Sequence, residues 1–139
     1  KRLTVVTNAD TESEWRPFAH AMPADSDQGW KNARCLFTDL KRELVFRFDL
    51  NTYRNAAVVL HVNQNYIIEV STNGTSWTEV QNYAAYHIIR AGYKEGDAYI
   101  GVSAEQFAVG AASMYIRIRN TDGTKGYGAA LTEFTIYYL

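Results

Sequence analysis

Aromatic side chains that stand next to arginine, histidine and asparagine are gathered in the segments between the expected strands. This mixture suits a sugar, because a flat aromatic ring can cover the apolar face of a pyranose while polar neighbours hydrogen-bond its hydroxyl groups. The segment 83–90, Tyr-Ala-Ala-Tyr-His-Ile-Ile-Arg, is the richest. The candidate ligand-binding residues are Trp30, Tyr86, His87, Arg90, Tyr93 and Tyr127.

Each of these aromatic residues also has a structural interpretation, in which it closes an open end of the core. Packing is the favoured interpretation for Trp15 and Trp30, since tryptophan is usually well buried. Tyr127 is different, because it lies between Gly126 and Gly128, which leave little to cover its ring. We therefore expect Tyr127 to be exposed.

No arrangement typical of an active site is visible in the sequence. The three histidines lie in unrelated segments, and there is no nucleophile elbow, zinc-protease motif or phosphate-binding glycine loop. His61, inside an apolar run, is interpreted as a core or sheet-face residue. Acidic pairs such as Asp25 and Asp27 are best explained as solvated loop carboxylates, because Asp and Glu are rarely buried. We expect a domain that is not an enzyme.

Two arginines could contribute to an anion site. Arg117 and Arg119 are two residues apart in an alternating segment, so both side chains point to the same face of a strand. They could hold an anionic sugar or another carboxylate. The favoured interpretation is an outer sheet face on which both arginines pair with acids of neighbouring strands, because Met114, Ile116 and Ile118 then point inward.

Composition excludes several function classes. The 139 residues suffice for one domain with a sizeable core, and 47% apolar with 21% charged residues exclude intrinsic disorder. A formal charge of -1 gives no overall attraction to nucleic acid, and no apolar run is long enough to cross a membrane. Cys35 is the only cysteine, so no disulfide can form within the chain. The first residues, Lys-Arg-Leu-Thr, do not have the pattern of a signal peptide, and we expect a domain excised from a larger protein.

Alternation of apolar and polar residues predicts an all-β fold without a convincing helix. Aromatic residues make up 14% of the chain, which favours strands, and Asn-Gly at 73–74 predicts a hairpin turn. Residues 8–34 and 84–97 are expected to be long loops. About eight strands indicate one antiparallel β-sandwich or jelly roll over residues 1–139, with an up-and-down barrel as the alternative. The expected strands are 3–7, 43–49, 56–62, 66–71, 77–83, 99–102, 113–119 and 131–139.

Four segments follow one another in an order known from a β-sandwich family. Residues 66–77, Tyr-Ile-Ile-Glu-Val-Ser-Thr-Asn-Gly-Thr-Ser-Trp, form a strand, a Ser-x-Asn-Gly-x-x-Trp turn and the start of the next strand. Residues 46–50 are Phe-Arg-Phe-Asp-Leu, and residues 114–119 are Met-Tyr-Ile-Arg-Ile-Arg. Residues 126–134 contain a glycine-rich loop and a closing strand with an acidic residue. Together these segments resemble galactose-binding-like (discoidin-type) domains over residues 43–139.

The resemblance implies a carbohydrate-binding module joined covalently to a glycoside hydrolase or polysaccharide lyase in a secreted or cell-surface bacterial protein. It also implies a structural calcium ion that connects an early acidic loop to the last strand, with Glu133, Asp25 and Asp27 as its ligands. The rival class is a structural or protein-interaction module. A platform of exposed aromatic residues at the loop end would support a sugar ligand, whereas a broad flat apolar patch would support a protein partner.

Overall fold

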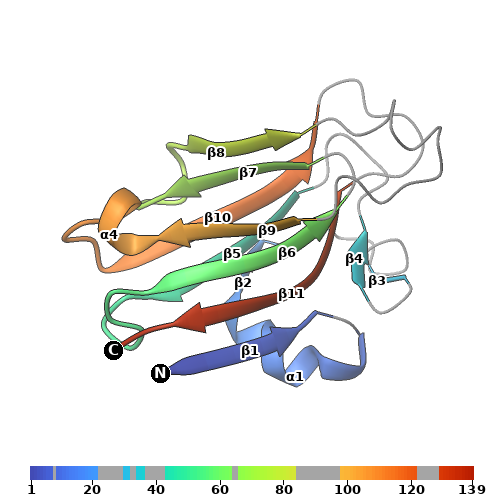
Figure 1. Cartoon of the computed structure of the whole chain (residues 1–139), viewed down its shortest axis with the longest axis horizontal. Helices are drawn as coiled ribbons and strands as arrows, with labels where there is room; N and C mark the ends of the chain where they lie inside the picture. Colours follow the sequence, from blue (N-terminus) through green and yellow to red (C-terminus); the bar gives the residue numbers. More distant parts are fainter. Residues whose placement is uncertain are drawn as a thin grey trace.

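The alternating strands each have one apolar face, and the fold buries these faces by packing two antiparallel sheets against each other. The predicted β-sandwich is confirmed in a computed structural model (Figure 1). The structure describes residues 1–7, 9–21, 30–31, 34–36, 43–63, 66–83, 98–121 and 129–139.

The first sheet has six described strands. Their order is β3–β4–β11–β6–β9, and β1 also pairs with β11. The two longest strands at its centre, β6 and β11, align with each other except for a register shift between Leu131 and Glu133. The bounds are β1 (Arg2–Val6), β3 (Trp30–Lys31), β4 (Arg34–Leu36), β6 (Ala57–Asn63), β9 (Ala98–Ser103) and β11 (Ala130–Tyr137).

The second sheet has five described strands in the order β2–β5–β10–β7–β8. In Figure 1, β9, β6, β11 and β1 form one layer, and β5 and β2 pass behind it. The bounds are β2 (Ala19–Ala21), β5 (Glu43–Asp49), β7 (Tyr66–Ser71), β8 (Thr78–Tyr83) and β10 (Ser113–Asn120).

Aromatic rings connect the two sheets in the core. Phe134 of the six-stranded sheet lies 5.0 Å from Phe46 and 5.6 Å from Phe48 of the five-stranded sheet, measured between ring centroids. Phe18 adds a fourth ring, whose centroid lies 5.3 Å from that of Phe134. All four side chains are buried, so the aromatic enrichment of the sequence is used here for packing between the sheets.

The expectation of one long loop over residues 8–34 is wrong for its described part. The chain there forms η1 (Ala9–Thr11), α1 (Glu12–Trp15) and η2 (Arg16–Phe18) before β2, and then β3 and β4. Trp15 is fully buried, which confirms its packing interpretation. Burial of Trp15 and Phe18 stabilises these short elements, which propensity alone would not. The short strands β2, β3 and β4 bring the number of described strands to eleven, whereas the sequence predicts about eight.

The β7–β8 turn and the segment after β9 are two further local features of the fold. Gly74 in the β7–β8 turn has φ +78°, and the Asn73 side-chain oxygen accepts hydrogen bonds from the backbone N–H groups of Thr75 and Ser76, which confirms the predicted hairpin. The sequence predicts no convincing helix, but the segment after β9, interpreted as a connector over residues 104–109, begins with the short helix α4 (Ala104–Phe107). No described helix is long and apolar enough to cross a membrane.

Candidate functional site

Most of the site residues expected from the sequence lie outside the described residues. These are Asp25, Asp27, Tyr86, His87, Arg90, Tyr93 and Tyr127. Trp30 is the first residue of β3, and its side chain is outside the described part as well. Glu133 is described and lies within β11. The expected loop site therefore stays a prediction.

One face of the six-stranded sheet points away from the core on four neighbouring strands. Val5, Leu60, Val102 and Phe134 point inward, so the residues between them point outward. The strand register arranges the outward residues in three rows, which together we call the aromatic face. The first row is Tyr99, His61, Glu133 and Val6. The second row is Gly101, Val59, Thr135 and Thr4. The third row is Ser103, Ala57, Tyr137 and Arg2.

Exposed large hydrophobic side chains gather on the aromatic face. Among the described residues there are five such side chains, and three belong to this face: Tyr99, Tyr137 and Val6. The other two, Val109 and Leu139, line a pocket at the end of the sandwich. Because the two exposed tyrosines of the described part both lie on this one sheet face, the aromatic face is its candidate functional site.

Tyr99 and His61 form a stacked pair at one end of the first row. Their ring centroids are 4.5 Å apart and the planes differ by 10°. The two residues are direct cross-strand partners on β9 and β6. The imidazole therefore fixes the orientation of the tyrosine ring, which is still 67% exposed. A ring that is ordered before it binds loses little conformational entropy on contact with a ligand.

Glu133 follows His61 in the first row and is paired with Val6 on its other side. These neighbours supply an imidazole and an aliphatic group, whereas calcium prefers hard oxygen ligands. Within the described ranges, no three His, Cys, Asp or Glu side chains form a group that could hold a metal ion. The expected calcium site therefore depends on Asp25 and Asp27. The position of Glu133 beside His61 and Tyr99 suits a hydrogen-bond acceptor for a ligand on the aromatic face.

The outer face of the five-stranded sheet carries an ion-pair network. The Nε atoms of Arg117 and Arg119 donate hydrogen bonds to Glu69 Oε1 at 2.9 and 2.7 Å. Arg117 also lies 3.5 Å from Glu43, and its guanidinium group stacks over the Trp77 ring at 4.2 Å. The interpretation of both arginines as ion-paired residues of an outer sheet face is confirmed.

Glu69 is the centre of this network, and it is only 7% exposed. Burial acts to raise the pKa of its carboxyl group, but the hydrogen bonds and positive charges of Arg117 and Arg119 outweigh burial, so the pKa lies below its ordinary value. The carboxylate is therefore ionised and already satisfied by protein donors. This network stabilises the sheet and does not offer the arginines to an anionic ligand.

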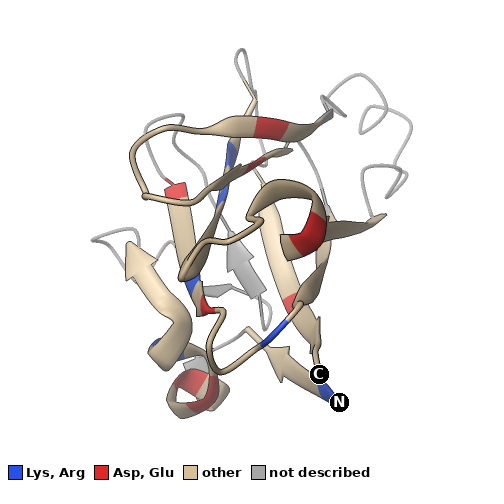
Figure 2. Ribbon diagram, turned by 90° about the vertical axis from the view of Figure 1, so that its left-hand side faces the viewer, with Lys and Arg blue, Asp and Glu red and all other residues tan. Residues whose placement is uncertain are grey.

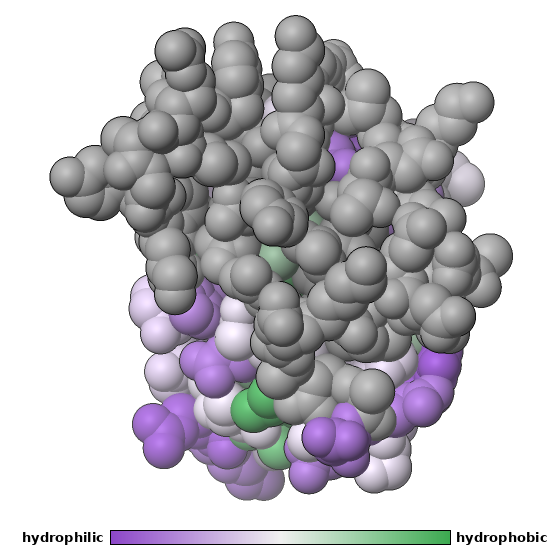
Figure 3. Space-filling model, turned by 90° about the vertical axis from the view of Figure 1, so that its right-hand side faces the viewer, coloured by the Kyte–Doolittle hydropathy of each residue, from purple (hydrophilic) through white to green (hydrophobic). Residues whose placement is uncertain are grey.

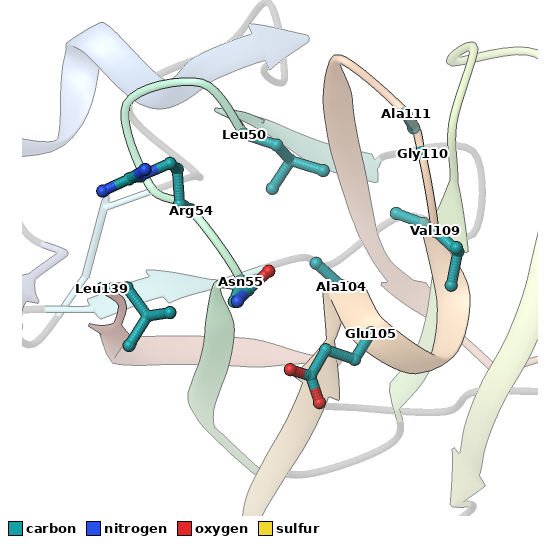
Figure 4. Close-up of a pocket in the computed structure, with 10 residues that line it drawn as sticks. Leu50, Arg54, Asn55, Ala104, Glu105, Val109, Gly110, Ala111 and Leu139 are labelled. Atoms are coloured by element: carbon teal, nitrogen blue, oxygen red, sulfur yellow. The ribbon is translucent and has the colours of Figure 1, made fainter.

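A pocket of about 540 Å³ lies at the end of the sandwich that carries both termini (Figures 1 and 4). Aliphatic side chains of Leu50, Val109 and Leu139 line it together with the charged side chains of Arg54 and Glu105. None of the described residues that line it is aromatic. The pocket therefore lacks the flat ring surface that the aromatic face offers to a sugar.

Charge does not single out another surface in the described part. Basic and acidic residues are interspersed along the described ribbon in Figure 2. On the side shown in Figure 3, the described residues are mainly hydrophilic, with small hydrophobic areas between them. Figure 2 shows no long stretch of described ribbon that carries charges of one sign alone.

Comparison with known proteins shows similarity to solved structures alone. No family model and no curated protein sequence matches the chain. A family GH115 4-O-methyl-α-glucuronidase specific for decorated arabinogalactans has 13% identity and a TM-score of 0.49, over 87% of this chain and 16% of that one. Chitosan-binding module 1 of a chitosanase/glucanase from Paenibacillus sp. IK-5 has 18% identity and a TM-score of 0.44, over 86% and 91%. A GH26-CBM35 β-(1,4)-mannanase from Podospora anserina has 13% identity and a TM-score of 0.46, over 99% and 28%.

These similarities do not extend to a ligand or an activity, because the identities are 13–18% and the TM-scores lie below 0.5. The chain spans 16% and 28% of the length of the two enzymes. The fold and the candidate site define the class of this protein as an antiparallel β-sandwich with exposed aromatic residues on one sheet face.

Sequence reasoning did not select Tyr99 and Tyr137 as site residues. The period-two pattern of their strands contains the signal that they point outward, since Ile100, Val102 and Ile136 alternate with them on the inner side. The sequence allows His61 a place in the core or on a sheet face, and in the structure His61 lies on the sheet face. Their proximity to one another depends on the order of the strands, which the pattern does not contain.

Proposed function

We propose that this protein is a non-catalytic carbohydrate-binding module. The observation that carries the proposal is the ring of Tyr99, which is 67% exposed and held in place by its stack on His61. An exposed and ordered aromatic ring can cover the apolar face of a pyranose. His61 and Glu133, in the same row, provide ring nitrogens and carboxylate oxygens for its hydroxyl groups.

The size of the aromatic face also favours a sugar over a protein partner. Four strands about 4.8 Å apart and three rows about 6.6 Å apart cover roughly 400 Å² when the margins are included. A stable protein interface buries about 800 Å² on each partner. The rival protein-interaction function would have to use a different and broader surface.

Binding to a glycan array tests the function, and the Tyr99→Ala variant tests the site. We expect selective binding of a few related glycans by the wild type. Loss of one ring contact of about 1.4 kcal/mol lowers the affinity about tenfold. Val109→Ala, which removes an exposed side chain outside the aromatic face, is the control and should bind like the wild type. A blank array for the wild type contradicts the function.

The loop residues expected from the sequence form the second part of the proposal. Tyr127 and its companions Trp30, Tyr86, His87, Arg90 and Tyr93 would extend or replace the contact at Tyr99. Tyr127→Ala separates the two locations. If Tyr127→Ala abolishes glycan binding while Tyr99→Ala does not, the module binds sugar at its loops and our placement on the sheet is wrong.

The resemblance supports three finer proposals. The module would be attached to a glycoside hydrolase or polysaccharide lyase, which it concentrates on a polysaccharide. The whole protein would be secreted or displayed on a cell surface. A structural calcium ion held by Asp25, Asp27 and Glu133 would stabilise the native state by mass action.

A further inference from the structure

The two exposed tyrosines of the aromatic face lie at opposite corners of the part formed by β9, β6 and β11. Tyr99 is in the first row on β9, and Tyr137 is in the third row on β11. The two positions are separated by two strand spacings and by four residues along the strands. With about 4.8 Å between strands and about 3.3 Å per residue, their Cα atoms are roughly 16 Å apart. This distance is longer than one pyranose ring.

The path between the two tyrosines is low and apolar. The midpoint of the diagonal falls on Val59, which is in the second row on β6. Gly101 and Thr135 are its cross-strand neighbours. A Cβ atom added to Gly101 would meet no other atom within 4 Å, so the space above this position is open. Among the described residues, none larger than valine therefore lies on the direct line between the two rings.

Each tyrosine has polar groups at its own end of the diagonal. His61 and Glu133 share the first row with Tyr99, and Arg2 is the cross-strand partner of Tyr137. Beyond Tyr137 the face continues into a hollow of about 310 Å³, which Ala57, Tyr137, Asn55 and Glu105 help to line. The surface thus has two exposed tyrosine rings, each with hydrogen-bonding side chains beside it, and only small side chains at the described positions between them.

We infer that the aromatic face binds an extended oligosaccharide chain along the diagonal from Tyr99 across Val59 to Tyr137, and not a single terminal sugar. This inference rests on the proposed function and narrows its ligand class to polysaccharide chains. Two separated rings increase the affinity only for a ligand that reaches both at once, since the second contact is then intramolecular. A monosaccharide can contact one ring at a time.

The first experiment measures affinity against chain length. Titration calorimetry is performed with oligosaccharides of one to six units prepared from soluble cellulose, galactomannan, xylan, arabinogalactan and chitosan. For the series that binds, we expect the affinity to rise about tenfold or more with chain length and then to level off. Equal affinity for the monosaccharide and the longest chain would overturn the inference.

The second experiment uses matched variants of the aromatic face. Tyr137→Ala should leave binding of the monosaccharide unchanged and remove most of the gain with chain length. Val59→Arg blocks the midpoint and should weaken the longest chain about tenfold or more. Val109→Arg is the control, because the same change is made at an exposed valine outside the aromatic face and should leave affinity within about twofold. Thermal melting confirms that each variant is folded.

The outcomes separate this inference from the proposed function. If no saccharide binds, the proposed function itself fails. If saccharides bind and Tyr99→Ala weakens their binding, but Tyr137→Ala and Val59→Arg behave like Val109→Arg, the module binds sugar and the extended path is wrong. Only a chain-length effect that depends on Tyr137 and Val59 supports it.

Discussion

The ion-pair network around Glu69 allows a sharp test of how this sandwich is stabilised. Glu69→Gln keeps the size of the side chain and removes the negative charge that Arg117 and Arg119 share. Removal of one partner from a buried ion pair costs about 3–5 kcal/mol. The two arginine side chains are 18% and 29% exposed, so water can solvate them in part. We therefore expect the free energy of unfolding to fall by about 2–3 kcal/mol.

Urea denaturation of the wild type and two variants measures this loss. The control is Glu12→Gln, because Glu12 pairs with Arg16 one helical turn away and both side chains are more than half exposed. Exposed ion pairs contribute about 1 kcal/mol or less. The reasoning is refuted if Glu69→Gln costs less than about 1 kcal/mol, or if the two variants lose the same free energy.

The pH dependence of Glu69→Gln has a definite sign. The pKa of Glu69 in the folded state lies below its ordinary value of 4.5, so the ionised carboxylate binds its partners in full above that pH. Its contribution is lost as the pH falls from about 4.5 through the folded-state pKa. The stability difference between wild type and variant should therefore shrink on acidification. A difference that stays constant between about pH 6 and pH 3 contradicts this origin of the stability.

Three further predictions concern the core, the hairpin and the metal. Phe134→Ala removes a ring that contacts three other phenylalanines and should cost about 3–5 kcal/mol in urea denaturation; a cost below about 1.5 kcal/mol would show that the core can collapse around the gap. Gly74→Ala should cost about 1 kcal/mol or more, because φ is +78° and the new Cβ would lie 3.3 Å from the Tyr115 ring, while Gly101→Ala, with open space, should be close to neutral. If calcium binds as the family resemblance implies, chelator should lower the melting temperature and elemental analysis should find the metal; an unchanged melting temperature with no metal detected excludes it.

The main strands could be predicted because their signal is local. Residues 43–49 and 113–119 alternate cleanly, and the structure has β5 and β10 there with the expected residues inside. The turn at Asn73-Gly74 was predictable for the same reason, since a positive φ is a property of one residue. The region after β1 was not predictable in this way. Its short helices owe their stability to the burial of Trp15 and Phe18 against distant strands.

The candidate site was less predictable than the fold. The loop residues that composition suggested lie outside the described part, so they remain a prediction. The aromatic face consists of residues that the sequence assigns to strands and not to loops. The sequence around an outward-pointing tyrosine does not show whether the tyrosine binds a ligand or is an ordinary surface residue. Its role depends on the side chains of the neighbouring strands, which are distant in the chain.

The alternation of apolar and polar residues is a property of each strand's own sequence, and it sets which face of the strand is buried. The order in which β9, β6, β11 and β1 pair, and their register, are properties of the folded chain as a whole. Strand order results from packing of the whole core and from contacts between residues far apart in the chain, which no local pattern records. Tyr99 and Tyr137 share one surface for this reason, as do His61 and Glu133.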